Sequence, residues 1–126
     1  MNRLIEVLNK FVDNNIEFLS LIGNHDLPYN NMDYFHTTPL SLLFKSKLVK
    51  PLDKIETSDT IIYGLHFTEM HLLKDIKELM DRKKTNILVM HYATDNTVPH
   101  ESIDKKELED FDIVVSGHDH MFYDHI

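Results

Sequence analysis

Three short apolar runs in this chain are each followed at once by a polar stretch that carries histidine. The runs and the residues after them are 18–22 with Gly23-Asn24-His25-Asp26, 87–90 with His91, and 113–115 with Gly117-His118-Asp119-His120. Short, continuously apolar runs are typical of strands buried on both faces of a parallel sheet. In an open α/β sheet, ligand-binding groups gather in the crevice beyond the carboxyl ends of the strands. We therefore expect the three polar stretches to converge at one edge of a sheet.

The hydrophobic periodicity predicts helices that alternate with these strands. Thr38-Pro39 has the form of a helix start, with threonine as N-cap and proline at the first helical position. The pattern predicts helices over 3–14, 39–44, 69–82 and 105–110, strands over 16–22, 54–56, 60–65, 86–91 and 111–115, a further strand from 121 to 126, and a loop over 23–37. This alternation favours the α/β class with a layered sheet.

Composition excludes several kinds of chemistry. A chain of 126 residues is one domain or part of one, and it has no cysteine for disulfides, thiolate metal sites or a cysteine nucleophile. No segment reaches the roughly 20 apolar residues of a membrane span, and the N-terminus lacks a secretion signal, so we expect a cytoplasmic protein without membrane contact. The formal charge of −8 argues against a broad basic surface for nucleic acid, although bound cations would offset part of it.

The residue types in the polar stretches are those of a divalent metal site. Histidine is the commonest nitrogen ligand, and an asparagine oxygen is a hard, neutral ligand suited to Mn²⁺ or Mg²⁺. In extended backbone His118 and His120 project to one side, so two neighbouring ions could each bind one of them. We interpret Gly117 as a residue that lets the chain turn tightly before them. A mononuclear zinc site on this histidine pair is the alternative, disfavoured because cysteines and a nearby glutamate ligand are absent.

In this order, the three stretches resemble the third, fourth and fifth motifs of the calcineurin-like metallophosphoesterase superfamily. The segments 37–44 and 61–65, with the apolar-Lys-Pro-Leu stretch between them, are similar to the SbcD branch, the DNA double-strand-break repair nucleases. The resemblance covers nearly the whole chain. It implies an α/β fold that is part of a layered α/β/β/α sandwich, with 1–126 as a metallophosphoesterase domain incomplete at both ends.

The resemblance also implies a role for each matched residue. The metal ligands would be Asn24, His91 and His118 for the second ion and His120 for the first. His25 would be the catalytic histidine that contacts the scissile phosphate, and Asp26 would orient it. The complete site would hold two divalent ions about 3.5–4 Å apart, Mn²⁺ in the first place and Mg²⁺, Fe²⁺ or Zn²⁺ as alternatives.

Two motifs of that superfamily are missing from the sequence. Asp-x-His and Gly-Asp-x-x-Asp would supply the other ligands of the first ion and would precede residue 1, and no Asp-x-His occurs upstream of Gly23. We therefore expect an internal fragment or a truncated reading frame that does not hold two metals by itself. The histidines without a matched role in the site are His36, His66, His71, His100 and His125.

Three classes of function remain. The first is the DNA exonuclease/endonuclease subunit of an SbcCD-type repair and recombination complex, with DNA and an SMC-like ATPase of the SbcC type as partners and a homodimer as a further assembly. The second is another calcineurin-like phosphoesterase that acts on nucleotides, small phosphodiesters or phosphoproteins. The third is a non-catalytic remnant that keeps the fold and binds a partner or one ion.

Overall fold

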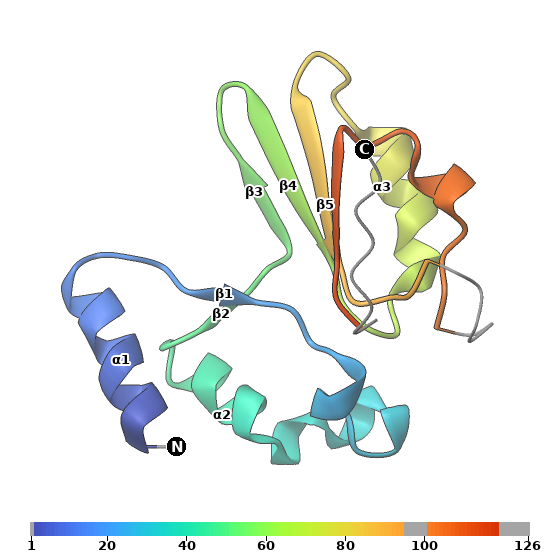
Figure 1. Cartoon of the computed structure of the whole chain (residues 1–126). Coiled ribbons are helices and arrows are strands. Elements are labelled where there is room, and N and C mark those ends of the chain that lie inside the picture. The colour runs from blue at the N-terminus through green and yellow to red at the C-terminus, as the bar shows by residue number, and fades with distance from the viewer. Residues whose placement is uncertain (1, 95–100, 119–126) are drawn as a thin grey trace.

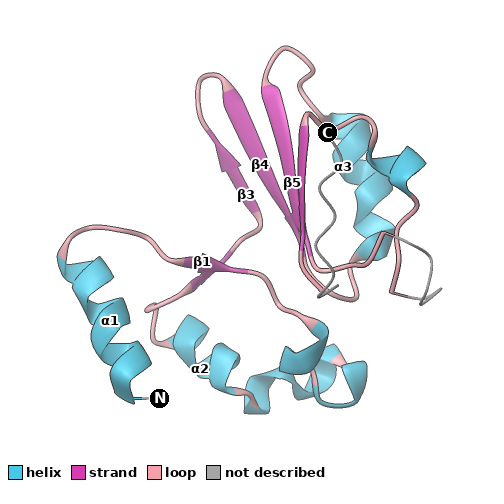
Figure 2. Ribbon diagram, viewed as in Figure 1, coloured by secondary structure: helices cyan, strands magenta, loops and turns pink. Residues whose placement is uncertain are grey.

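A four-stranded mixed sheet forms the centre of the computed structural model, which describes residues 2–94 and 101–118 (Figure 1). The strand order is β3-β4-β5-β6, and the last three strands are parallel (Figure 2). The four strands are β3 (Lys54–Glu56), antiparallel to its neighbour, β4 (Thr60–Leu65), β5 (Thr85–Met90) and β6 (Ile113–Ser116). A separate parallel pair joins β1 (Leu19–Ser20) to β2 (Lys50–Pro51). The α/β class predicted from the sequence is confirmed.

The two faces of the central sheet differ in how much they are covered. On one face Leu65, Leu88 and Met90 are fully buried, packed with α3 (Leu73–Leu79) and the 3-10 helix η5 (Lys105–Leu108). On the other face Ile113 and Val115 of β6, which pair with Ile87 and Val89, remain about half exposed, at 49% and 51%. Because side chains alternate along a strand, this face is apolar as well.

A smaller core lies beneath the first part of the chain. Helices α1 (Asn2–Asp13) and α2 (Pro39–Lys45) bury Leu8, Leu43 and Val49 together. The side chain of Thr38 accepts a hydrogen bond from the Ser41 amide at 3.3 Å, so the predicted N-cap is confirmed. None of the helices in the described ranges is long and apolar enough to cross a membrane.

Several elements are shorter than the sequence pattern predicts. The strand expected over 16–22 has ladder pairing only at Leu19–Ser20, because the chain then leaves β2 and bonds to the end of β4, where the Phe67 amide donates to Ile22 O. The helix expected over 69–82 begins as a 3-10 turn and ends at Leu79. The Asn86 side chain donates to two carbonyls of the following turn, at Asp81 and Lys84, and so fixes a tight turn there.

The loop expected over 23–37 and the helix expected over 105–110 are built from 3-10 turns. The first contains η1 (Asn24–Asp26), η2 (Pro28–Asn30) and η3 (Met32–Thr37). The second is η5, capped by Asp104, whose side chain accepts from the Lys106 amide at 2.9 Å. The strand predicted from 121 to 126 lies outside the described residues.

Candidate metal centre

The three polar stretches meet, but they do not all follow strands of one sheet as expected: His91 and His118 lie beyond β5 and β6 of the central sheet, and Asn24 lies beyond β1 of the separate pair. His91 Nε2 lies 2.9 Å from Asn24 Oδ1, although the two residues are 67 positions apart in the sequence. The rings of His91 and His118 are perpendicular, with their centroids 5.2 Å apart. The structure therefore brings together Asn24, His91 and His118, three of the four residues predicted as metal ligands. The fourth, His120, lies outside the described residues together with Asp119.

Two glycines allow the His91 ring to occupy its position. A Cβ atom on Gly23 would lie 2.9 Å from His91 Cε1, closer than real Cβ contacts, and one on Gly117 would lie 3.0 Å from His91 Nδ1, tighter than most of them. The tight-turn interpretation of Gly117 is wrong, because the left-handed residue here is His118, with φ 85°, and no described glycine has a positive φ. Both glycines serve close packing of backbone against imidazole.

An aromatic wall lies beside the two histidines. Phe67 is buried, meets the His91 ring edge to face at 6.3 Å, and stacks on the His118 ring at 6.1 Å. Burial lowers the pKa of His91, and the neighbouring charge of His118 lowers it further, while Asp26 acts in the opposite direction. The His91 ring is therefore neutral at pH 7, the form in which an imidazole nitrogen can bind a cation.

Glu101 is a member of this cluster that the sequence placed only in the loop after His91, as a residue that could face substrate. Its Oε2 lies 2.9 Å from His118 Nε2, and both side chains are largely buried. The premise that no glutamate lies near the histidine pair is therefore wrong. Glu101 is held in place by a backbone bridge, in which the Ala93 amide donates to Glu101 O and the Ile103 amide donates to Ala93 O, both at 2.8 Å. Because Glu101 follows no apolar strand, the strand-end pattern could not have found it.

The two residues predicted to be catalytic lie next to the ligands. Asp26 Oδ2 accepts a hydrogen bond from the Gly23 amide at 2.9 Å and so closes the turn η1 on itself. His25 is exposed and faces a cavity of about 690 Å³, which also borders Asn24. The expected Asp26–His25 orientation is not tested by this bond, and it stays a prediction.

His66 directly follows β4, at the same end of the sheet as the candidate site, but its contacts are structural. It is 3% exposed, and its Nδ1 accepts from the Ile22 amide at 2.9 Å. The remaining nitrogen must then carry the proton, and it lies 2.9 Å from Asp53 Oδ1. This ring fixes the strand end that delivers Asn24.

Comparison with known proteins identifies the family. Residues 2–122 match the family model for calcineurin-like phosphoesterases. The chain belongs to the calcineurin-like phosphoesterase family. A similar protein is the DNA double-strand break repair protein Mre11 of Sulfolobus acidocaldarius. The two sequences are 27% identical over an alignment 128 residues long, which covers 92% of this chain and 33% of the relative. The chain thus spans about a third of the length of that relative. No solved structure matches significantly.

The donor atoms present suit the divalent metal that a calcineurin-like phosphoesterase is expected to bind. With metal–ligand bonds of roughly 2.1 Å, two donors on one ion at a right angle lie about 3 Å apart. The 2.9 Å between Asn24 Oδ1 and His91 Nε2 is a hydrogen bond, in which the imidazole N–H donates to the amide oxygen, and the same separation is compatible with two donors on one ion once that proton is lost. Within 2–94 and 101–118, no three histidine, aspartate or glutamate side chains lie together in a way that could hold an ion.

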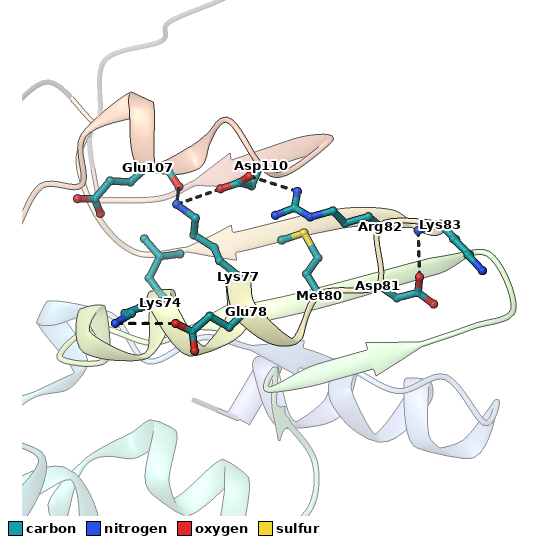
Figure 3. Close-up of a pocket in the computed structure, with 10 residues that line it drawn as sticks. Lys74, Lys77, Glu78, Met80, Asp81, Arg82, Lys83, Glu107 and Asp110 are labelled. Carbon is teal, nitrogen blue, oxygen red and sulfur yellow. Dashed lines mark hydrogen bonds and ion pairs between the residues drawn. The ribbon is translucent and has the colours of Figure 1, made fainter.

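A second cavity, of about 890 Å³, lies between α3 and the segment 105–110 (Figure 3). Asp110 accepts ion pairs from Lys77 at 3.0 Å and Arg82 at 3.2 Å, and Lys77 also donates to Glu107 O at 2.9 Å. The Lys77 hydrogen bond, and after it the Arg82 hydrogen bond, hold the pKa of Asp110 below its usual range. Because these charges neutralise one another and no histidine lines the cavity, we assign it a bracing role rather than phosphoesterase chemistry.

Proposed function

We propose that this chain carries the second-ion half of a metal-dependent phosphodiesterase centre, and that its substrate is DNA. The observation that carries the proposal is the contact between Asn24 and His91, with the His118 ring beside it, at the converging strand ends. The similarity to an archaeal double-strand break repair protein supports the nuclease branch. By the same reasoning, an SMC-like ATPase is the partner we propose.

In this centre Asn24, His91 and His118 would bind one divalent ion, and His120 would contribute to the other. A bound ion would lower the pKa of water to near neutral and stabilise charge on the phosphate. His25, exposed at the cavity beside these ligands, would contact the scissile phosphate and give a proton to the leaving oxygen. The buried Phe67 ring excludes water from one side of His91 and His118.

Glu101 would orient His118 in this centre. Its carboxylate accepts from His118 Nε2, so the nitrogen left for a cation is Nδ1. A carboxylate behind a metal-binding histidine fixes the ring and its tautomer, and removing such a group weakens metal affinity by about 10- to 100-fold.

Calorimetric titration with Mn²⁺ tests the proposal. We expect Asn24→Ala and His91→Ala to lose measurable binding, and Glu101→Gln to bind about tenfold more weakly. The matched control is His36→Ala, because this exposed histidine bonds only locally, to Asp33 O. Unchanged Mn²⁺ affinity in His91→Ala would refute the centre. A stoichiometry of two ions per chain would refute the prediction that the chain does not hold both.

Cleavage distinguishes the nuclease from other phosphoesterases. In the protein completed with the family's first two motifs, we expect Mn²⁺-dependent cleavage of linear duplex DNA. Cleavage of bis(p-nitrophenyl) phosphate alone would favour the second class, a phosphoesterase for small substrates. His25→Ala should abolish cleavage and leave Mn²⁺ affinity unchanged, and equal loss of the metal would contradict its catalytic role.

A further inference from the structure

Two tyrosines stand exposed on the turn that follows the metal-binding segment. The side chain of Tyr29 is 91% exposed and that of Tyr34 is 47% exposed. Their ring centroids are 5.8 Å apart, and the rings are nearly perpendicular, at 68°. A nearly bare aromatic ring that touches a second exposed ring is unusual in the absence of a binding partner, because both lose the free energy of burial.

The turn that carries these rings is anchored on both sides. Leu27 is buried in the main core, and the Asn30 amide donates to its carbonyl at 2.9 Å. Asn31 accepts from the Asp33 amide at 2.9 Å and so caps the next turn. Between these anchors Tyr29 and Asn30 adopt left-handed backbone, with φ 56° and 53°. Asparagine adopts this conformation readily, but for tyrosine it is unfavourable, so the surroundings must enforce it at Tyr29.

The turn lies at the edge of the candidate metal centre. Pro28 and Asn30, on either side of Tyr29, line the same 690 Å³ cavity as His25. Asn30 also lines a cavity of about 440 Å³ on the side of Phe67 and Glu101. Tyr29 lies between Pro28 and Asn30 in the chain, so the turn that carries it borders the cavity that Asn24 and His25 also line.

We propose that Tyr29 and Tyr34 form a stacking platform for a nucleobase of a single strand whose neighbouring phosphate lies at His25. The proposal rests on the proposed function, since it places a base beside the phosphate that the centre would cleave. Aromatic side chains bind single strands by stacking, whatever the base, because every base has a π-face.

The chemistry of the segment favours stacking over attraction of phosphates. Residues 24–39 contain no lysine or arginine. The Thr37 hydroxyl is used within the turn, where it donates to Tyr34 O at 2.7 Å. The affinity that the platform supplies is therefore expected to depend little on salt, because few counterions are released.

A single tryptophan tests the platform, because the chain has none of its own. In Tyr29→Trp, with EDTA present, fluorescence should be quenched by oligothymidylate and much less by an abasic oligonucleotide of equal length. A comparison of oligodeoxyuridylate with oligouridylate, which differ only in the 2′-hydroxyl, shows whether the platform also distinguishes the sugar. The control is Leu79→Trp, at a position 83% exposed at the end of α3, where no quenching is expected.

Affinity measured by anisotropy of a labelled oligothymidylate completes the test. Tyr29→Ala should bind about tenfold more weakly than the natural chain with an unchanged salt slope, and Tyr29→Phe should bind as the natural chain does. Equal affinity for the abasic strand, or equal quenching in Leu79→Trp, would overturn the platform. Quenching that rises with protein concentration in the absence of any oligonucleotide would also overturn the platform. It would assign the surface to a second copy of the chain.

Failure of the platform and failure of the proposed function give different results. Mn²⁺ binding does not require Tyr29. Loss of stacking with Mn²⁺ binding retained would remove only the platform. Loss of Mn²⁺ binding in the natural chain would remove the metal centre while leaving the quenching measurement intact.

Discussion

The position of His91 is determined at the scale of single atoms. Its ring lies against the backbone of two glycines from chain segments far apart in the sequence, and a methyl group on either would come within about 3 Å of it. Its Nε2 meets Asn24, and its edge meets Phe67. The ring is therefore held from several sides before any cation binds, which is the preorganisation that a metal ligand needs.

Gly23→Ala tests this packing. The added methyl group should displace the His91 ring by a few tenths of an ångström, weaken Mn²⁺ binding about tenfold and lower the free energy of unfolding by about 1–3 kcal/mol. Urea denaturation and calorimetric titration measure the two effects. In a His91→Ala background the same substitution should cost much less, because the clash is removed. Equal destabilisation in both backgrounds would contradict the packing argument.

At the scale of elements, Tyr92 joins the end of β5 to the turn before α3. Its hydroxyl accepts from the Met70 amide at 3.0 Å and donates to His66 O at 3.2 Å. Its ring stacks on Phe67 at 5.6 Å. Burial raises the pKa of Tyr92, so the hydroxyl stays protonated and remains a donor at neutral pH. The link keeps Phe67 against the histidines.

Tyr92→Phe should lower the free energy of unfolding by about 1–3 kcal/mol, because the Met70 amide and the His66 carbonyl lose their shared partner. Urea denaturation measures this loss. The matched control is Tyr29→Phe, whose ring is 91% exposed and which should change stability little. A loss in the control as large as that in Tyr92→Phe would show that the hydroxyl bonds are not the cause.

At the scale of the whole molecule, a cation in the candidate centre would join three segments that the chain keeps far apart. These are the turn after β1, the end of β5 and the residue after β6. Because unfolding separates the ligands, binding free energy adds to the stability of the native chain.

Mn²⁺ should therefore raise the thermal midpoint. At a concentration of about 100 times Kd the expected gain is roughly 2.7 kcal/mol, or of the order of 10 °C for a domain of this size. Differential scanning fluorimetry measures the shift. Asn24→Ala should remove most of it, and the His36→Ala control should retain it. An equal shift in Asn24→Ala would show that Mn²⁺ stabilises the chain from another site.

The central sheet also presents an apolar face at this scale. Ile113 and Val115 are about half exposed there, in contrast to the fully buried Leu65 and Leu88 on the face that α3 covers. Hydrophobic strands with one incompletely covered face are less stable than strands buried on both. The strands are continuously apolar in the sequence because both faces of the sheet carry apolar side chains. Only one of these faces is fully buried within the described residues.

Local sequence patterns correctly predicted the strands β3 to β6, the start of α2 and the positions of Asn24, His91 and His118 beyond strands. These follow from interactions between near neighbours, namely apolar runs, turn residues and an N-cap, which the order of residues encodes directly. The family resemblance also came from such local motifs, and the match over residues 2–122 confirmed it.

The residues that surround the proposed ligands follow from long-range contacts in the folded chain. Glu101 reaches His118 from a bridge with Ala93, Phe67 forms the wall through its stacking on Tyr92, and the glycines matter because the His91 ring fills the space beside them. The tertiary structure also shortened β1 and ended α3 at Leu79, through bonds to Phe67 and from Asn86. Such contacts join residues that are distant along the chain, so they depend on the path of the backbone in space, which no local pattern records.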